Sequence, residues 1–304
     1  MSQPAPLLVK ADITPSEVIA LRAMSVLHQR VRALSGIRLV VSAVIAAAGA
    51  VVTMAELTAT WVTVAGALWA GAYSIWLVSW MDEALLRAAK LQEMFEVELF
   101  RLPWNTTVAG PQVRSEDASQ LSKKFKDRQV ANDWLEMPNL PRPFDILARQ
   151  IQNLGWGSRI RRRYANVVLA VVVAWALAGA VVAFVGGLTF AEIILRWFVP
   201  SLGGLLLGVD TWRQQRSIAK ERDRVLAFVE DETRKAVRRA KKAATADALL
   251  VLSRQVQDTL FNTRCRAPRA PSRLFYLAYY RSDAVDFRAP VQRLVSDFAA
   301  APTP

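Results

Sequence analysis

The stretch NLGWGSRIRRRYANVVLAVVVAWALAGAVVAFVGG, residues 153–187, sets three adjacent arginines and a tyrosine directly against a long apolar run. Residues 165–191 carry no charge over 27 positions. About 20 consecutive apolar residues are enough for a helix to cross a bilayer. A buried helix of a soluble protein rarely stays uncharged for so long, so this run predicts a transmembrane helix.

Three further apolar runs accompany it. Residues 39–55 and 61–81 are uncharged, and the fourth run, 193–209, is interrupted by Arg196. The uncharged part of the fourth run is therefore only 197–209, which is also compatible with a short amphipathic or re-entrant segment. We interpret it as a span, because Arg196 lies near one end, where a long side chain can reach the membrane interface.

The distribution of Lys and Arg predicts the topology. The connectors 56–60 and 188–192 carry none, whereas segments 1–36, 82–164 and 210–304 carry 4, 14 and 19 of the 39. Short loops rich in Lys and Arg stay in the cytoplasm. We therefore predict two helical hairpins with both termini cytoplasmic.

This topology divides the chain into five predicted parts. They are an N-terminal cytosolic amphipathic helix (1–36), a first transmembrane hairpin (37–81), a cytosolic helical middle segment (82–164), a second hairpin (165–209) and a basic helical cytosolic tail (210–304). It also explains the opening stretch, because anionic headgroups attract basic residues at a cytoplasmic span end. The predicted lipid anchor of the third span comprises Arg161, Arg162, Arg163 and Tyr164.

Helical signals dominate the cytosolic parts. Thr14, Pro15 and Glu17 form a capping box with proline at the first helical position. An apolar stripe follows at helical spacing, and it suits either the bilayer surface or another cytosolic helix. We favour packing on a helix, because the polar face is only lightly basic. Since no stretch alternates long enough to predict a sheet, we expect an all-α membrane protein.

The sequence lacks the residue patterns of common catalytic, metal and cofactor sites. The chain has one histidine, His28, and one cysteine, Cys265, so a zinc site of the usual composition cannot form. It has neither a phosphate-binding P-loop nor a Gly-rich dinucleotide loop. We expect no enzyme activity, no metal and no cofactor. The net charge of +13 would suit a nucleic-acid-binding protein, but four spans make DNA or RNA the poorer expectation.

Several stretches together resemble a known family. LFRLPWN (99–105) and DWLEMPNLPRPFDILARQIQNLGWGSRIRRRY (133–164) are similar to the SMODS-associated four-transmembrane effectors, where SMODS denotes a bacterial synthetase of cyclic oligonucleotides. The stretches ALRAMSVLHQRVRAL (20–34), VPSLGGLLLGVDTWRQQR (199–216) and SRQVQDTLFNTRCRAPRAPSRLFYLAYYR (253–281) fit as well. The tail departs from the pattern, because it lacks a tryptophan after its proline; Phe275 or Tyr276 can substitute.

The resemblance implies an antiphage role. An infection-activated synthetase would make a cyclic di- or trinucleotide, the cytosolic part would sense it, and the spans would breach the bacterial inner membrane as a homo-oligomer. The alternative is a non-conducting membrane-anchored sensor or scaffold. A transporter is a weaker third possibility, because internal repeats are missing.

The fourth span carries the candidate pore residues. Gly204 and Gly208 form a small-residue face that permits close helix association, within one chain or between chains. Pro200 can act as a hinge, and a charged residue in a span usually faces protein or water. We predict that this span faces the oligomer axis with Arg196 near the pore mouth; the alternative is that Arg196 only reaches outer headgroups.

The candidate ligand site lies in the tail. A cyclic oligonucleotide offers phosphates to arginines and base faces to aromatic rings. The basic residues before the third span already have a predicted role in lipid anchoring. We therefore favour the tail as the ligand site, with two tryptophans of the middle segment as its opposing wall. In the alternative, these aromatics only hold the cytosolic helices together. The predicted ligand residues are Arg264, Arg266, Arg269, Arg273, Tyr279, Tyr280, Trp104 and Trp134.

Overall fold

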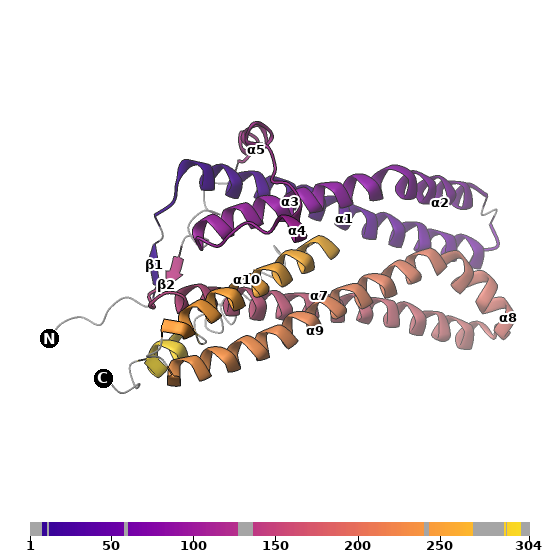
Figure 1. Cartoon of the computed structure of the whole chain (residues 1–304). Coiled ribbons are helices and arrows are strands. Elements are labelled where there is room, and N and C mark those ends of the chain that lie inside the picture. The colour runs from indigo at the N-terminus through magenta and orange to yellow at the C-terminus, as the bar shows by residue number, and fades with distance from the viewer. Residues whose placement is uncertain are drawn as a thin grey trace.

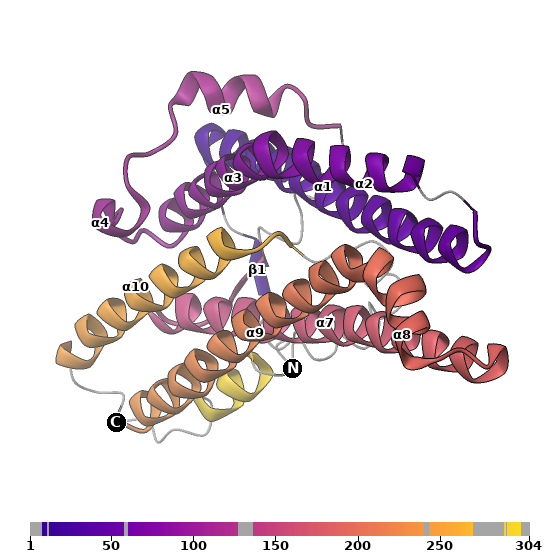
Figure 2. The ribbon, with the colours of Figure 1, turned by 90° about the vertical axis from the view of Figure 1, so that its right-hand side faces the viewer.

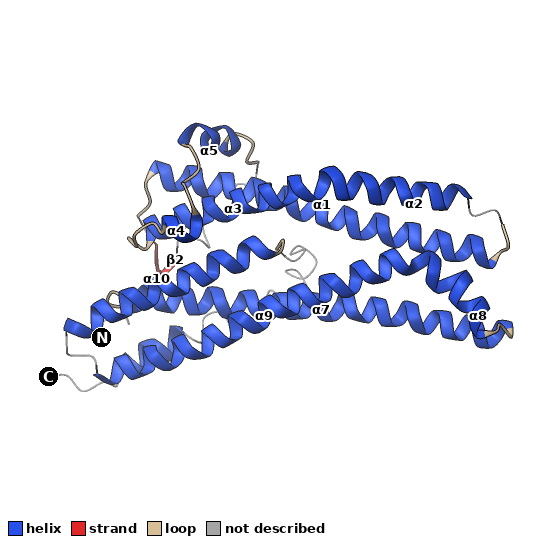
Figure 3. Cartoon of the chain, turned by 45° about the vertical axis from the view of Figure 1, so that its right-hand side comes forward, coloured by secondary structure: helices blue, strands red, loops and turns tan. Residues whose placement is uncertain are grey.

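The structure, a computed structural model, is built almost entirely of helices (Figure 3). It describes residues 8–10, 12–57, 60–126, 136–239, 243–269, 289 and 291–298. Within those residues, four helices are long and apolar enough to cross a membrane: Pro15–Met54, Thr60–Leu99, Phe144–Gly186 and Phe190–Arg238.

The first hairpin begins with α1 (Pro15–Met54). Its capping box is present, since the Thr14 side chain accepts from the Glu17 amide and Glu17 accepts from the Thr14 amide at 2.6 Å. The predicted N-terminal helix and first span are thus one unbroken helix. The chain returns through α2 (Thr60–Ala72), a π-helical turn η1 (Tyr73–Leu77) and α3 (Val78–Leu99).

The second hairpin repeats this plan. Helix α7 (Phe144–Gly186) ends at Gly187, whose φ of 62° is a left-handed conformation that glycine adopts without strain. The chain then returns through α8 (Phe190–Ile193), a second π-helical turn η2 (Ile194–Phe198) and α9 (Val199–Arg239).

Shorter elements complete the fold. They are α4 (Thr106–Ala109), α5 (Ser115–Ser122), α10 (Ala243–Arg266) and a helix over 291–298. A small antiparallel ladder joins β1 (Leu8–Lys10) to β2 (Glu136–Pro138), with Leu8 opposite Pro138. The sequence did not predict this ladder, because three residues are too few to show an alternating pattern.

The molecule is elongated, with α8 and the end of α1 at one end and β1 and the helix over 291–298 at the other (Figure 1). Figure 2 shows two layers, with α1, α2 and α3 above and α7 and α9 below. Helix α10 lies between the layers at the end opposite the connectors, where it contacts α3, α7 and α9. We call the helical segments at this end that lie outside the apolar runs the polar bundle. They comprise residues 15–36, 82–99, 115–122, 144–164, 210–239 and 243–266.

Two apolar clusters hold the polar bundle together. One joins α1 to α3 and α5 through residues that include Met24, Leu27, Phe95 and Leu121. The predicted stripe on the first helix therefore packs against other helices. The second joins the start of α7 to α9 and α10 through Leu147, Ile151, Leu154, Val229, Val256 and Leu260. Removing a fully buried aromatic such as Phe95 costs about 3–5 kcal/mol, so these clusters are strong supports.

The spans pack through small residues. A Cβ added at Gly204 would lie 3.0 Å from the Ala46 Cβ of α1, and one at Gly208 would lie 2.5 Å from Val172 of α7. The fourth span therefore packs between the first and third spans. Outward-facing apolar side chains such as Phe184 remain 90% exposed, as expected of a surface that meets lipid.

Candidate functional site, a basic cavity at the base of the spans

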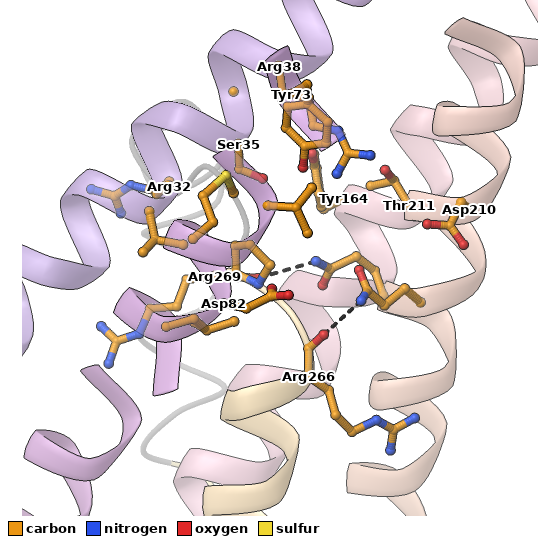
Figure 4. Close-up of a pocket in the computed structure, with 18 residues that line it drawn as sticks. Arg32, Ser35, Arg38, Tyr73, Asp82, Tyr164, Asp210, Thr211, Arg266 and Arg269 are labelled. Atoms are coloured by element: carbon orange, nitrogen blue, oxygen red, sulfur yellow. Dashed lines mark hydrogen bonds between the residues drawn. The ribbon is translucent and has the colours of Figure 1, made fainter. Parts of the chain in front are cut away.

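A cavity of about 250 Å³ lies between the two hairpins where the spans enter the polar bundle (Figure 4). At this end of the spans, the residue that flanks each apolar run lines the cavity. These four residues, one from each span, are Arg38, Asp82, Tyr164 and Asp210. A molecule bound here would contact all four spans at once.

Basic and aromatic side chains dominate the wall from the first hairpin. Arg32 and Arg38 come from α1, and the guanidinium of Arg38 lies 3.9 Å from the ring centroid of Tyr73 in η1. Arg269, which follows α10, donates to the side-chain oxygen of Gln92 at 2.6 Å. In Figure 4, Arg38 lies beside Tyr73, and Arg32 and Arg269 lie together on one side of the cavity.

The opposite wall fixes the segment after α10 in place. Gln214 of α9 donates to the Arg266 carbonyl at 2.7 Å, and Gln215 donates to the Pro268 carbonyl at 3.3 Å. These two contacts are the dashed lines in Figure 4. Arg161 of α7 lies behind this wall, donating to Gln215 at 2.6 Å and to the Pro268 carbonyl at 3.3 Å.

Positive charge accumulates behind the cavity. Arg161 and Arg222 are 4% and 6% exposed, and Arg222 donates to the Thr263 hydroxyl at 3.0 Å. Neither guanidinium forms an ion pair with a carboxylate in the described part of the chain. Burying a charge without an opposite charge is costly, so the site attracts anions.

The pKa values of these arginines report the same surplus. Burial lowers the pKa of Arg161 to about 10, with contributions from Arg264 and Arg266. Burial and the charge of Arg264 lower the pKa of Arg269 to about 9, and burial and Arg161 lower that of Arg222 well below its usual value. Because each arginine disfavours the charge of its neighbours, a bound anion would relieve all of them.

Two buried carboxylates on α3 partly balance this charge. Arg264 of α10 donates to Glu96 at 2.8 Å, and Gln257 donates to Glu93 at 2.9 Å. Arg254 pairs with Glu93 and, at 2.8 Å, with Asp258. Burial raises the pKa of Glu96, but Arg264 and the hydrogen bonds of Gln257 and Gln92 outweigh it, so Glu96 stays ionised. This network ties α3 to α10.

The structure separates the predicted ligand residues. Arg266 and Arg269 both line the cavity, although the Arg266 guanidinium points away from it and pairs with Glu221. Arg264 is buried in the network with Glu93 and Glu96. Trp104 donates to the Gly110 carbonyl at 2.9 Å and packs in an apolar cluster with Ala89 and Phe261. Arg273, Tyr279, Tyr280 and Trp134 lie outside the described residues.

The predicted lipid anchor is corrected at two positions. Arg161 and Tyr164 are 4% and 9% exposed, so they face the protein interior and not the headgroups. Arg162 is exposed and pairs with Asp223. Successive helix residues point about 100° apart, so Arg161 and Tyr164 face the interior while Arg162 lies at the surface beside Asp223 of α9.

The predicted pore residues of the fourth span contact neighbouring spans. Arg196 donates to Glu56 at 2.9 Å and lies 4.0 Å from Glu192, so it links the two hairpin connectors. Pro200 lies against Gly49 of the first span and is the second residue of α9, just after η2. A pore axis along this span stays a prediction.

Comparison with known proteins now adds to this geometry. Residues 9–294 match the model of the SMODS-associating 4TM effector domain. The chain belongs to this family. It is therefore a multi-pass membrane protein with the family's four spans, as the resemblance implied.

A curated relative points to the same context. The chain is 26% identical over 161 residues to a probable CBASS effector molecule of Bacillus cereus (strain VD146). The match covers 51% of this chain and 52% of that protein, so the chain spans about half the length of the curated relative. No solved structure matches the chain.

Sequence reasoning missed most of the cavity. Arg32, Arg38, Asp82 and Asp210 were not singled out, although three of them directly flank apolar runs. That position was the available signal, since charged residues at the ends of spans meet wherever the spans converge. Arg222 gave no such signal, because it stands among many charged residues of a long helix.

Proposed function

We propose that this protein is an antiphage effector that permeabilises the bacterial inner membrane when a cyclic oligonucleotide binds its polar bundle. Membership of an effector family and similarity to a probable CBASS effector support this role. The observation that carries it is the basic cavity, because residues at the ends of all four spans line it and buried arginines lie beside it. An anionic signal bound there is in position to change how the spans pack.

The proposal places the polar bundle and both termini in the cytoplasm. The excess of Lys and Arg in the segments that form this bundle, and their absence from both connectors, supports that orientation. Single cysteines test it in a Cys265→Ala background. Leu57→Cys in the first connector should react with an impermeant thiol reagent added to intact spheroplasts, whereas Gln120→Cys in α5 should not. Labelling of Gln120→Cys from outside would reverse the topology.

Membrane permeabilisation is proposed to involve several copies of the chain. Gly204 and Gly208 pack against neighbouring spans of the same chain, so contacts between copies would use the outward apolar faces. The partner in signalling would be the synthetase that makes the nucleotide. Spans that only anchored a sensor would need no change in packing.

The test measures binding and leakage together. The purified protein is reconstituted into dye-loaded vesicles of phosphatidylethanolamine and phosphatidylglycerol, and a panel of cyclic di- and trinucleotides is added. One nucleotide should bind and release the dye. Binding without release would support the anchored sensor, and a panel with no binder would remove cyclic oligonucleotides from the proposal.

A further inference from the structure

The cavity has the components of a phosphate site on both sides. Arg32 and Arg38 stand on the first hairpin, Gln215 on the second, and Arg269 on the segment after α10. Arginine forms strong charge-assisted hydrogen bonds with phosphate oxygens. The hydroxyl of Ser35 also lines the wall and can donate to an anion, whereas that of Thr211 donates to the Leu207 carbonyl at 2.8 Å.

Charge behind the wall favours the same ligand. Gln215 and Pro268, which line the cavity, are the residues to which Arg161 donates. Arg161 therefore lies one side chain behind the surface, and Arg222, which donates to Thr263, lies close enough for its charge to interact with those of Arg161 and Arg269. Two tyrosines, Tyr73 and Tyr164, give the cavity aromatic surface for a ring attached to the anion.

We propose that the cavity is a phosphodiester-binding site that contacts the phosphate through Arg32, Arg269 and Gln215 and is stabilised from behind by Arg161 and Arg222. This inference rests on the proposed function and adds its site. A phosphodiester can come from a soluble cyclic nucleotide or from an anionic lipid headgroup at this membrane boundary. We infer that the soluble nucleotide is the signal, because the lining includes Arg266, Pro268 and Arg269 at and just after the end of α10, which belongs to the polar bundle.

The size of the cavity implies how binding acts. Ligand sites usually enclose about 300–1,000 Å³, whereas this cavity encloses about 250 Å³. It accommodates one phosphate with its sugar, so a whole cyclic oligonucleotide enters only if the two hairpins move apart. Binding is thereby coupled to span packing.

Gly36 allows a steric test that leaves every charge in place. It lines the cavity, and a Cβ built on it meets no atom within 4 Å. Gly36→Leu should therefore fill the cavity while improving the helical propensity of α1. The matched control is Gly203→Leu, since Gly203 also has open space around its Cβ position but is exposed on the fourth span.

The experiment has two measurements. The first is binding of the cyclic di- and trinucleotide panel to detergent-solubilised protein. The second is the shift in the thermal unfolding midpoint in nanodiscs when phosphatidylglycerol replaces phosphatidylcholine. Gly36→Leu and Arg269→Gln should each weaken nucleotide binding roughly tenfold or more. Gly203→Leu and Arg162→Gln, which removes an exposed arginine, should bind like the unmodified protein.

Each outcome decides between the possibilities. If the cavity variants differ from the controls only in the unfolding shift with phosphatidylglycerol, the phosphodiester site exists but binds lipid. The cyclic nucleotide part of the proposed function then fails. If a nucleotide binds Gly36→Leu with unchanged affinity, the site is elsewhere and the proposed function survives. If neither ligand distinguishes Gly36→Leu from Gly203→Leu, the phosphodiester site is overturned.

Discussion

Two glycines of α7 differ sharply in their surroundings although they lie two positions apart. A Cβ added at Gly157 would lie 1.9 Å from the Arg222 guanidinium, whereas one at Gly155 would meet Leu226 at 3.5 Å, an ordinary contact. Gly157 thus provides the space in which a buried arginine lies flat against the helix. This close approach places the Arg222 side chain of α9 directly against α7.

Alanine substitutions at these two positions should have opposite effects. Gly157→Ala should lower the free energy of unfolding by about 1–3 kcal/mol, because Arg222 must move and lose its hydrogen bond to Thr263. Gly155→Ala should raise it by about 0.5–1 kcal/mol through helix propensity. Thermal unfolding in detergent measures both. Equal effects would contradict the placement of Arg222.

The only histidine of the chain should make stability depend on pH. His28 is 5% exposed, and its pKa is well below the usual value because of burial first and the charges of Arg269 and Arg264 second. The unfolded chain takes up a proton near pH 6.5, and the folded protein does so only at lower pH. The free energy of unfolding therefore falls as the pH drops below about 6.5.

We predict that His28→Gln loses less stability than the unmodified protein between about pH 6.5 and 5.5, by roughly 1 kcal/mol. Unfolding midpoints across this range measure the difference. Burial raises the pKa of Glu93, so this residue makes the free energy of unfolding change with pH in the opposite direction. Its contribution is the same in both proteins and cancels in the difference between them. Parallel pH profiles for the two proteins would show that His28 is not buried as a neutral group.

At the scale of single residues, the sequence predicted local features better than tertiary ones. The cap at Thr14 and Glu17 follows from neighbouring residues alone, and it was confirmed. Arg161 was assigned to lipid because its sequence neighbours suggested it, whereas its direction depends on the position of α9. A rule that reads neighbours along the chain cannot supply that position.

At the scale of elements, the helices were predictable and their irregularities were not. The spans follow from their apolar runs. The two π-helical turns, η1 and η2, leave no such trace, since one inserted residue hardly changes an apolar pattern. Both occur in the returning helix of a hairpin, and η1 contributes Tyr73 to the cavity.

The buried pair between Glu96 and Arg264 should hold α10 against α3. Glu96→Gln leaves Arg264 without its closest carboxylate, and breaking such a buried pair costs about 3–5 kcal/mol. We expect faster hydrogen exchange across α10. Glu98→Gln is the matched control, because Glu98 is exposed on the same helix and accepts from Ser16 at 3.1 Å. Unchanged protection of α10 in Glu96→Gln would contradict this role.

At the scale of the whole molecule, the relation between the hairpins was beyond sequence reasoning. Charge distribution predicted two hairpins, but nothing in either one specifies its partner surface. The structure joins them through Arg196 and Glu56 at the connectors and through Ala46 and Gly204 inside the spans. At the other end they diverge around the cavity and α10 (Figure 2).

The central claim is that ligand binding moves one hairpin relative to the other. A disulfide between Ala46→Cys and Gly204→Cys should prevent this, because a Cβ on Gly204 lies 3.0 Å from the Cβ of residue 46. That distance is close to the roughly 3.5–4.5 Å of natural disulfides, so a small adjustment allows the bond. Cys265, whose burial raises its pKa to about 11, is replaced by alanine to avoid mixed pairing.

The decisive measurement is nucleotide-triggered dye release from vesicles that carry this double-cysteine variant, before and after reduction. The single-cysteine variants serve as controls and should release dye under both conditions. We predict that the oxidised double variant binds the nucleotide more weakly and releases no dye, and that reduction restores both. Release at the same rate from the oxidised and reduced double variant would contradict the account, because the hairpins would then not need to separate.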